Sequence, residues 1–175
     1  MKLLKWVVAI VVCAWLGQYA LALALPSLVM ETLYALGTKQ QGYNQLAISE
    51  LPDEEFRTIV RPSPDLLYAS CFYNLENGPV VIEAHIPSRY WSMQFYQMNT
   101  DNYAGITNQR DERYRTGSTV NVTLIGSDES PNDFAGEVIQ SPTQRGIMLL
   151  RASAIGDRDE QQAALLASRC EPATR

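Results

Sequence analysis

Histidine is nearly absent from the chain, since His85 is the only one among 175 residues. Catalytic zinc sites usually combine two or three histidine or cysteine ligands with a carboxylate, and neither Cys-x-x-Cys nor His-x-x-x-His spacing occurs. Serine–histidine catalysis would depend on His85 alone, which the pattern places beside Glu83 on the polar face of a strand. Gly-rich phosphate loops and dinucleotide fingerprints are also lacking. We therefore expect no metal site and no cofactor.

Positive charge is scarce as well. The chain has 14 basic and 19 acidic residues, for a net charge of -5. Lys2 and Lys5 are the only charged residues among the first 25, so the remainder stands at -7 (12 minus 19). Such a chain repels nucleic-acid phosphates and offers no basic patch to anionic lipid. No linker or repeat divides the roughly 150 residues that follow, which is the usual size of one domain.

Residues 6–25 form an uncharged run, WVVAIVVCAWLGQYALALAL. Roughly 20 apolar residues match a hydrocarbon core of ~30 Å, and a single helix satisfies its own backbone there. Lys2 and Lys5 precede the run, and positive charge stays cytoplasmic. We expect residues 1–38 to be a single-pass anchor with a membrane-proximal extension. Residues 39–175 would be the exported domain.

A cleaved signal peptide is the alternative for this segment, with cleavage after residue 22 or 24. In that case the domain would be soluble in the periplasm. The length of the run favours a retained anchor, as do Trp6 and Tyr19, which suit the two interfaces. Helical spacing of apolar residues continues past Pro26, where we expect a kink as the helix leaves the bilayer.

Two of the three cysteines lie outside the apolar run, Cys71 in a predicted strand and Cys170 near the C-terminus. Disulfides persist in exported domains, and a Cys71–Cys170 bridge would tie the C-terminal tail to the sheet. Two separate buried thiols are the alternative, because a bridge needs Cα atoms within about 4.4–6.8 Å of each other.

The exported part reads as short strands. Alternating or apolar patterns predict strands over 66–75, 79–86, 90–98, 119–125, 136–140 and 146–151. The Asn77-Gly78 pair between the first two predicts a hairpin. The exception is residues 157–169, a helix capped by Asp157. Its predicted inner stripe is Ala163, Leu166, Ala167 and Cys170.

Five sequence motifs follow one another along the domain. They are RPSPDLLY (61–68), NGPVV (77–81), RYWSMQF with TDNY (89–95 and 100–103), SPTQR (141–145) and DRD (157–159). In this order they resemble the family of domains of unknown function numbered 1254, over roughly residues 55–170. The family has no generally established reaction.

The resemblance implies a jelly-roll sandwich. We therefore expect a mainly β protein: an antiparallel jelly-roll-like β-sandwich with an N-terminal transmembrane helix and a short C-terminal helix. Longer members carry a second domain, of family 1214, after this one, and the chain is expected to lack it. Short anchored members are similar to proteobacterial proteins that have a separate family 1214 protein encoded beside them. This implies a bacterial inner-membrane anchor with a periplasmic domain.

Arg61, Asp65 and Tyr68 bracket a Pro-x-Pro-Asp turn. Proline and aspartate are typical of turns, so these residues serve either the turn or the rim of a ligand pocket. Tyr90 and Trp91 point to opposite faces of a strand, so one of them is expected outside the core.

Polar residues near Tyr90 complete the candidate ligand-binding set. Asp101 and Asn102 either contribute to a pocket between the sheets or form an Asx turn. Arg145 is expected to pair with Asp65 or Asp101, more as a structural salt bridge than as a catalytic group.

Three functions fit these observations. The first is an anchored, non-enzymatic periplasmic module that binds a family 1214-type partner protein. The second is a small-ligand-binding protein with Tyr68, Tyr90 and Asn102 near the ligand. The third is a hydrolase or isomerase with Asp65 or Asp101 as base, which has the least support because no nucleophile–base pair is evident.

Overall fold

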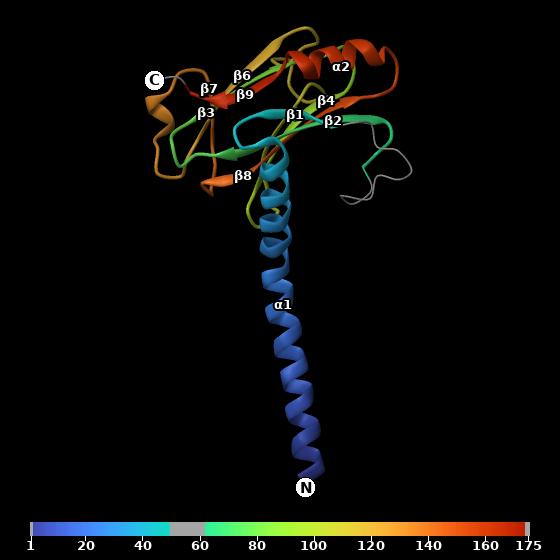
Figure 1. Ribbon diagram of the computed structural model, residues 1–175, viewed down its shortest axis with the longest axis vertical. Helices are drawn as coiled ribbons and strands as arrows, with labels where there is room; N and C mark the ends of the chain where they lie inside the picture. Colours follow the sequence, from blue (N-terminus) through green and yellow to red (C-terminus); the bar gives the residue numbers. More distant parts are fainter. Residues whose placement is uncertain (1, 50–61, 174–175) are drawn as a thin grey trace.

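The computed structural model describes residues 2–49 and 62–173. They form a long N-terminal helix, α1 (Lys2–Gln41), and a two-layer β domain into which the helix runs (Figure 1). A short helix, α2 (Arg158–Ala167), lies at the end of the molecule farthest from the N-terminus. The described residues are thus mainly β with an apolar N-terminal helix and a short C-terminal helix, as the sequence predicts.

Helix α1 is long and apolar enough to cross a membrane, with a mean hydropathy of 2.1 over its most apolar window. The helix continues without a break through Pro26 and ends at Gln41, three residues beyond the predicted anchor segment. Most of its side chains are exposed, but Met30 and Tyr34 are buried. The last turns of α1 are therefore part of the domain.

The strands form two sheets. Sheet A has the order β1-β2-β8-β4-β5 with antiparallel neighbours throughout. Its strands are β1 (Leu46–Ile48), β2 (Leu66–Asn74), β8 (Arg145–Ser153), β4 (Trp91–Gln97) and β5 (Asn102–Thr107). Sheet B has the order β7-β6-β3-β9. Its strands are β7 (Glu137–Gln140), β6 (Thr119–Ile125), β3 (Val80–His85) and β9 (Arg169–Pro172), with a 3-10 turn, η1 (Pro131–Asp133), before β7.

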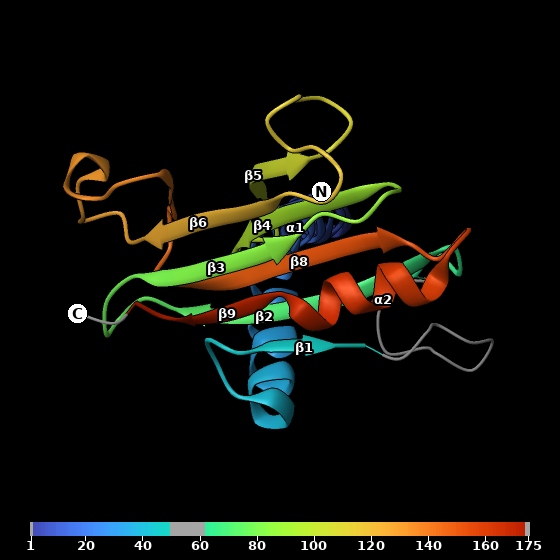
Figure 2. The ribbon, with the colours of Figure 1, turned by 90° about the horizontal axis from the view of Figure 1, so that it is seen from above.

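The core lies between the two sheets. Along β2 one of the two alternating sets of side chains, Leu67, Ala69, Cys71 and Tyr73, is buried throughout, as expected for the period-two pattern of a strand. They meet inward side chains of sheet B such as Ile82, Val122 and Leu124. Figure 2 shows sheet B and α2 lying over sheet A, with α1 beneath.

The predicted hairpin between the first two strands is wrong. β2 and β3 belong to different sheets, and the Asn77-Gly78 turn carries the chain from sheet A to sheet B. Gly78 does adopt a positive φ, 120°, so the local turn chemistry is as expected. Both edges of β2 are already occupied, by β8 on one side and by β1 on the other. The Asn44 side chain extends this second edge, bonding the backbone N–H and C=O of Asn74 at 2.7 and 2.9 Å.

Two further features of the sheets depart from the prediction. The β6–β7 pair is parallel, so sheet B is mixed rather than antiparallel. Strands β1, β5 and β9 were not predicted, because β1 and β9 are very short and β5 contains Asn102 and Gly105, which are depleted in strands. Each of these three strands lies at a sheet edge.

The buried stripe of α2 is also on a different face from the predicted one. Ala163, Leu166 and Ala167 are exposed, whereas Gln161, Leu165 and Ser168 are buried. Gln161 donates to Ser88 Oγ at 3.3 Å, and Ser168 Oγ accepts from the His85 backbone N–H at 3.1 Å. A hydrophobicity pattern misses this face because two of its positions are polar. Asp157 caps the helix as predicted, accepting from the Glu160 N–H at 3.2 Å.

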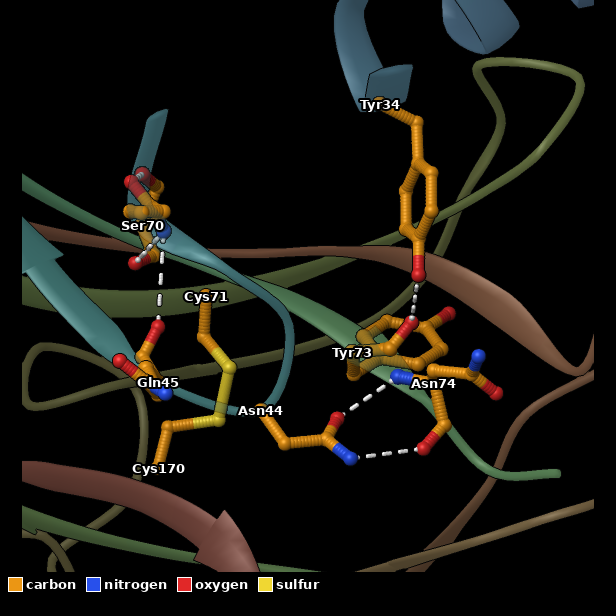
Figure 3. Close-up of a disulfide and its surroundings, with 9 residues drawn as sticks. Tyr34, Asn44, Gln45, Ser70, Cys71, Tyr73, Asn74 and Cys170 are labelled. Atoms are coloured by element: carbon orange, nitrogen blue, oxygen red, sulfur yellow. Dashed lines mark hydrogen bonds between the residues drawn. A yellow bond between two sulfur atoms is a disulfide. The ribbon is translucent and has the colours of Figure 1, made fainter. Parts of the chain in front are cut away.

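A disulfide joins the two layers. Cys71 of β2 and Cys170 of β9 are bonded, with their Cα atoms 6.4 Å apart (Figure 3). Both residues are buried in the core, and the bond closes a loop with a sequence separation of 99 residues. The third cysteine, Cys13, is exposed on α1.

Replacing both bonded cysteines by alanine is expected to lower the free energy of unfolding by about 2–4 kcal/mol, because the unfolded chain regains the freedom of a long loop. Denaturant unfolding of the full-length protein in detergent measures the change. Cys13→Ala is the matched control and should leave the midpoint unchanged. Equal stability of the double variant and the parent would contradict a structural role for the bond.

Candidate functional site

Two features lie on the outer face of sheet A, the face that points away from sheet B. They are the contact with helix α1 and a polar hollow. The cross-strand register places Tyr68, Arg151, Ser92 and Thr107 in one row of that face. A parallel row holds Phe72, Ile147, Tyr96 and Asn102. Helix α1 packs at the corner near Phe72, and a polar hollow lies toward β4 and β5.

We call the α1 corner the helix junction. Tyr34 Oη donates to the Tyr73 carbonyl oxygen at 3.1 Å (Figure 3). The Tyr34 ring also meets the Phe72 ring edge-on, with centroids 5.9 Å apart. About two turns of helix later, Gln41 Nε2 donates to the Ser70 carbonyl oxygen at 3.0 Å. These contacts span the last turns of α1 and fix both its position and its rotation on the sheet.

Arg145 belongs to the helix junction, and its role in ligand binding stays a prediction. Its Nη2 lies 2.9 Å from Glu31 Oε1, and its guanidinium lies over the Tyr34 ring, 5.4 Å from the centroid. The predicted partners Asp65 and Asp101 are wrong because both lie in exposed turns. Sequence periodicity did not indicate that the end of α1 packs against β8, the strand that begins at Arg145. The ion pair is half-exposed, so it adds more to orientation than to stability.

Gly37 makes the close approach of α1 possible. A Cβ at this position would lie 1.9 Å from the Phe72 ring. A glycine in a helix usually lowers stability by about 1 kcal/mol relative to alanine. Here the missing side chain leaves a notch that the Phe72 ring fills, so close packing outweighs helix propensity.

The polar hollow lies on the same outer face, has a volume of about 660 Å³ and is lined mainly by polar residues. Its floor comes from side chains of β4, β5 and β8. Its wall comes from Glu137 of β7 and from the segment after β5, namely Gln109, Arg110, Asp111, Arg113 and Tyr114. Tyr90 and Asn102, both predicted as ligand-binding residues, are among the lining residues. Trp91, the neighbour of Tyr90, is fully buried in the core, so Tyr90 is the one of the two that lies outside it.

Hydrogen bonds organise the floor of the hollow. Ser92 is 1% exposed, and its Oγ accepts from Tyr90 Oη at 3.0 Å and from Arg151 Nε at 3.2 Å. Asn102 Nδ2 donates to Gln94 Oε1 at 2.9 Å. The five polar side chains are thus tied into two groups on adjacent strands.

The wall of the hollow contains two paired acids. Asp111 forms a salt bridge with Arg113 at 2.7 Å, and this guanidinium lowers the pKa of the Asp111 carboxyl. Tyr114 Oη donates to the Glu137 carboxylate. Burial, together with this negatively charged acceptor, raises the pKa of Tyr114 to about 12. Tyr114 therefore stays protonated and serves as a donor at neutral pH.

A second tyrosine group lies in the core behind the hollow. Tyr73 Oη is within 3.1 Å of Tyr103 Oη and 3.0 Å of Ser141 Oγ. Burial raises the pKa of both tyrosines, so both remain neutral. The hydroxyl groups of these residues bond to one another inside the protein. We therefore interpret the group as stabilising the sheet and not as taking part in a reaction.

The remaining predicted site residues are not brought to the hollow. Arg61 lies outside the described residues. Tyr68 Oη accepts from the Ser63 N–H at 2.9 Å, and the Asp65 carbonyl oxygen accepts from the Ala154 N–H at 2.7 Å. Asp101 accepts from Asn99 Nδ2 at 2.7 Å within the β4–β5 turn. The Tyr68 hydroxyl and the Asp101 carboxylate therefore take part in turns, and the Asp65 backbone bonds to the residue after β8. A ligand-binding role for these three residues stays a prediction.

Ser92, Gln94 and Arg151 line the hollow but were not predicted as site residues. Each lies on the outward face of β4 or β8, and the inward face of both strands is apolar. A polar residue there is ordinarily a solvated one, so the available signal was weak. What brings them together is the pairing of β4 with β8, which the sequence did not reveal.

His85 lies on sheet B, away from the hollow. Its Nδ1 is 3.2 Å from Thr119 Oγ1, and its Nε2 is 3.5 Å from Glu83 Oε1. Glu83 and His85 share the half-exposed side of β3, as the alternation predicts. Within residues 2–49 and 62–173, no group of three or more histidine, cysteine or acidic side chains could hold a metal ion.

Comparison with known proteins identifies a family and a fold. A family model described as "Protein of unknown function (DUF1254)" matches residues 43–172. No curated protein matches the chain. The fold is similar to that of the VPA0106 protein from Vibrio parahaemolyticus, with a TM-score of 0.60 and 15% identity. It is also similar to that of an uncharacterised protein from Burkholderia cenocepacia, with a TM-score of 0.52 and 13% identity.

These two structures are longer than the part they share with this chain. The matches cover 86% and 82% of this chain but only 39% and 40% of the respective neighbours. The chain therefore spans about two fifths of each neighbour's length. At these identities the similarity establishes the fold alone.

Gly37→Ala is expected to loosen the helix junction, because the new methyl group would overlap the Phe72 ring. Overpacking of this kind costs about 1–3 kcal/mol. Hydrogen exchange of the full-length protein in detergent should become faster in residues 38–48. Gly17→Ala in the same helix is the control, since nothing lies within 4 Å of its added Cβ. If Gly37→Ala stabilised the junction, helix propensity would be the dominant effect and the notch would have no packing role.

Proposed function

The chain belongs to the family of proteins of unknown function DUF1254, and on that premise we propose that it is a membrane-anchored, non-enzymatic module that binds a partner protein. In this proposal residues 1–38 are the anchor and residues 39–175 are a sandwich of the jelly-roll type. The domain would lie in the periplasm and the anchor in a bacterial inner membrane. The binding surface would be the outer face of sheet A.

The helix junction is the observation that carries this proposal. The apolar run ends at Leu25, and the first buried residue of α1 is Met30. At 1.5 Å per residue the two are about 7–8 Å apart along the helix axis. The outer face of sheet A would thus be turned toward the membrane and held close to its surface. A fixed orientation of this kind favours interaction with another component that the membrane also positions.

Part of this outer face is available to a partner. Helix α1 covers the corner around Phe72 and Arg145, while Gln94, Tyr96 and Leu149 remain half-exposed. Mixed surfaces of aromatic, aliphatic and polar side chains are typical of protein interfaces.

A family 1214-type protein is the partner we propose. The resemblance noted above implies it, because longer members combine the two domains in one chain. The length of the two structural neighbours beyond the matched part is compatible with this arrangement.

Compartment is part of the same proposal. Lys2 and Lys5 at the start of α1 favour a cytoplasmic N-terminus, which would place the domain on the other side of the membrane. The Cys71–Cys170 bond supports that side, since disulfides persist in oxidising compartments.

Site-specific photo-crosslinking tests the proposed surface. A benzophenone amino acid at Tyr96, on the outer face of sheet A, should form a crosslink in cells to one protein, identified by mass spectrometry as family 1214-type. The same group at Leu166, exposed on α2 away from this face, is the matched control and should form none. Absence of any crosslink at Tyr96, or equal yields at both positions, would overturn the proposed interface.

A further inference from the structure

Arg151 is the residue of the polar hollow that is best suited to bind a ligand. It is half-buried at the centre of the floor, flanked by Tyr68 on β2 and Ser92 on β4. Its Nε donates to Ser92 Oγ. Among the described residues no acceptor or carboxylate engages its two terminal nitrogens. A partly desolvated cation without a counter-ion is unfavourable, and a bound anion would relieve that cost.

We propose that the polar hollow binds a small oxyanion, a carboxylate or a phosphate, through the terminal nitrogens of Arg151. The planar guanidinium matches two oxygens of such a group at once, which gives both strength and direction. This site is separate from the helix junction and does not depend on the identity of a partner protein.

Ser92 positions the guanidinium for this role. Because Ser92 is buried and its Oγ accepts from both Tyr90 Oη and Arg151 Nε, the Nε edge of the guanidinium is held against the sheet. The opposite edge, with the two terminal nitrogens, is left for the ligand. Ser92 therefore acts through Arg151 and is a positioning residue.

The amides beside Arg151 suit the uncharged part of such a ligand. Asn102 Nδ2 is already bonded to Gln94 Oε1, which leaves Gln94 Nε2 as a donor and Asn102 Oδ1 as an acceptor. Gly105 faces them, and a Cβ at this position would lie 2.5 Å from Gln94 Oε1. The glycine thus keeps space for the amide pair. Hydroxyl or carbonyl groups on the ligand would bond to these two atoms.

Local charge favours an anion even though the chain is acidic. The hollow is lined by three arginines, Arg110, Arg113 and Arg151, and by two acids, Asp111 and Glu137, for a local sum of +1. Asp111 is paired with Arg113, and Glu137 accepts from Tyr114. Among residues 2–49 and 62–173, no acid forms a salt bridge with Arg110 on the exposed rim or with Arg151 on the floor, so these two supply the positive charge that the described acids do not neutralise. Since the chain as a whole is at -5, attraction would act at short range.

Thermal unfolding of the full-length protein in phosphatidylcholine nanodiscs tests the proposal, with inorganic phosphate and succinate as separate probes. A ligand that binds the folded state raises the midpoint with a saturable dependence on concentration. We expect this for at least one probe. Arg151→Gln should weaken the apparent affinity tenfold or more, as expected for loss of charged hydrogen bonds. Arg151→Lys keeps the charge without the fork and should bind with intermediate affinity.

Arg158→Gln is the matched control, since it makes the same charge change at an exposed position of α2 and should bind as the parent does. Ser92→Ala should weaken binding although Arg151 itself is intact. Nitrogen NMR relaxation should show that the Arg151 Nε–H group is more mobile in this variant than in the parent. That second readout separates positioning from a general loss of stability.

A second arm distinguishes a soluble ligand from a lipid headgroup. If phosphatidylglycerol in the nanodisc raises the midpoint of the parent but not of Arg151→Gln, the oxyanion is a lipid phosphate. If the soluble probes alone do so, the ligand is soluble. The proposal is overturned if neither source has a saturable effect, or if the effect is the same in the parent and in both Arg151 variants. A negative result here leaves the crosslinking test of the partner surface unaffected.

Discussion

Strand β2 is the element on which the rest of the structure depends, because adjacent side chains of a strand point to opposite faces. Cys71 points inward and is bonded to Cys170 of sheet B, whereas Phe72 points outward into the notch at Gly37 of α1. The next carbonyl, of Tyr73, accepts from Tyr34. Three consecutive residues thus join helix α1, sheet A and sheet B. A displacement of α1 would therefore move side chains that are in contact with the core.

The sequence predicted which side chains share a face better than it predicted which strands are neighbours. Alternation is a property of one strand alone, so local pattern could place Leu67 and Tyr73 on one face and Tyr90 and Trp91 on opposite faces. Pairing depends on competition between distant segments. Asn77-Gly78 forms a turn as predicted, but both edges of β2 are paired with other strands, β8 and β1. The sequence of the turn contains no information about that pairing. In α2 the buried Gln161 and Ser168 find partners on other elements, so hydrophobicity alone selected the wrong face.

The candidate site shows the same division between local and distant information. Tyr90 and Asn102 could be found because they belong to the RYWSMQF and TDNY motifs and carry polar groups suited to a pocket lining. Arg151 could not, because its significance comes from its neighbours across two strands, Tyr68 and Ser92. Arg145 had the more suggestive motif context, yet its partner is Glu31, 114 residues away in sequence. The roles of these two arginines thus depend on contacts with residues that are distant in sequence, and sequence spacing does not reveal such contacts.

The position of the hollow relative to α1 links the two proposals. Both lie on the outer face of sheet A, so in the proposed orientation anything that reaches Arg151 would enter the space between the sheet and the membrane. The junction would hold that space at a constant width, since Glu31, Tyr34 and Gln41 fix α1 by contacts spread over its last three turns. A flexible tether would let the hollow face any direction, and neither a membrane-bound partner nor a lipid headgroup would then meet it reliably. Rigid attachment through a 40-residue helix is therefore what would make this face of the sandwich usable at a membrane surface.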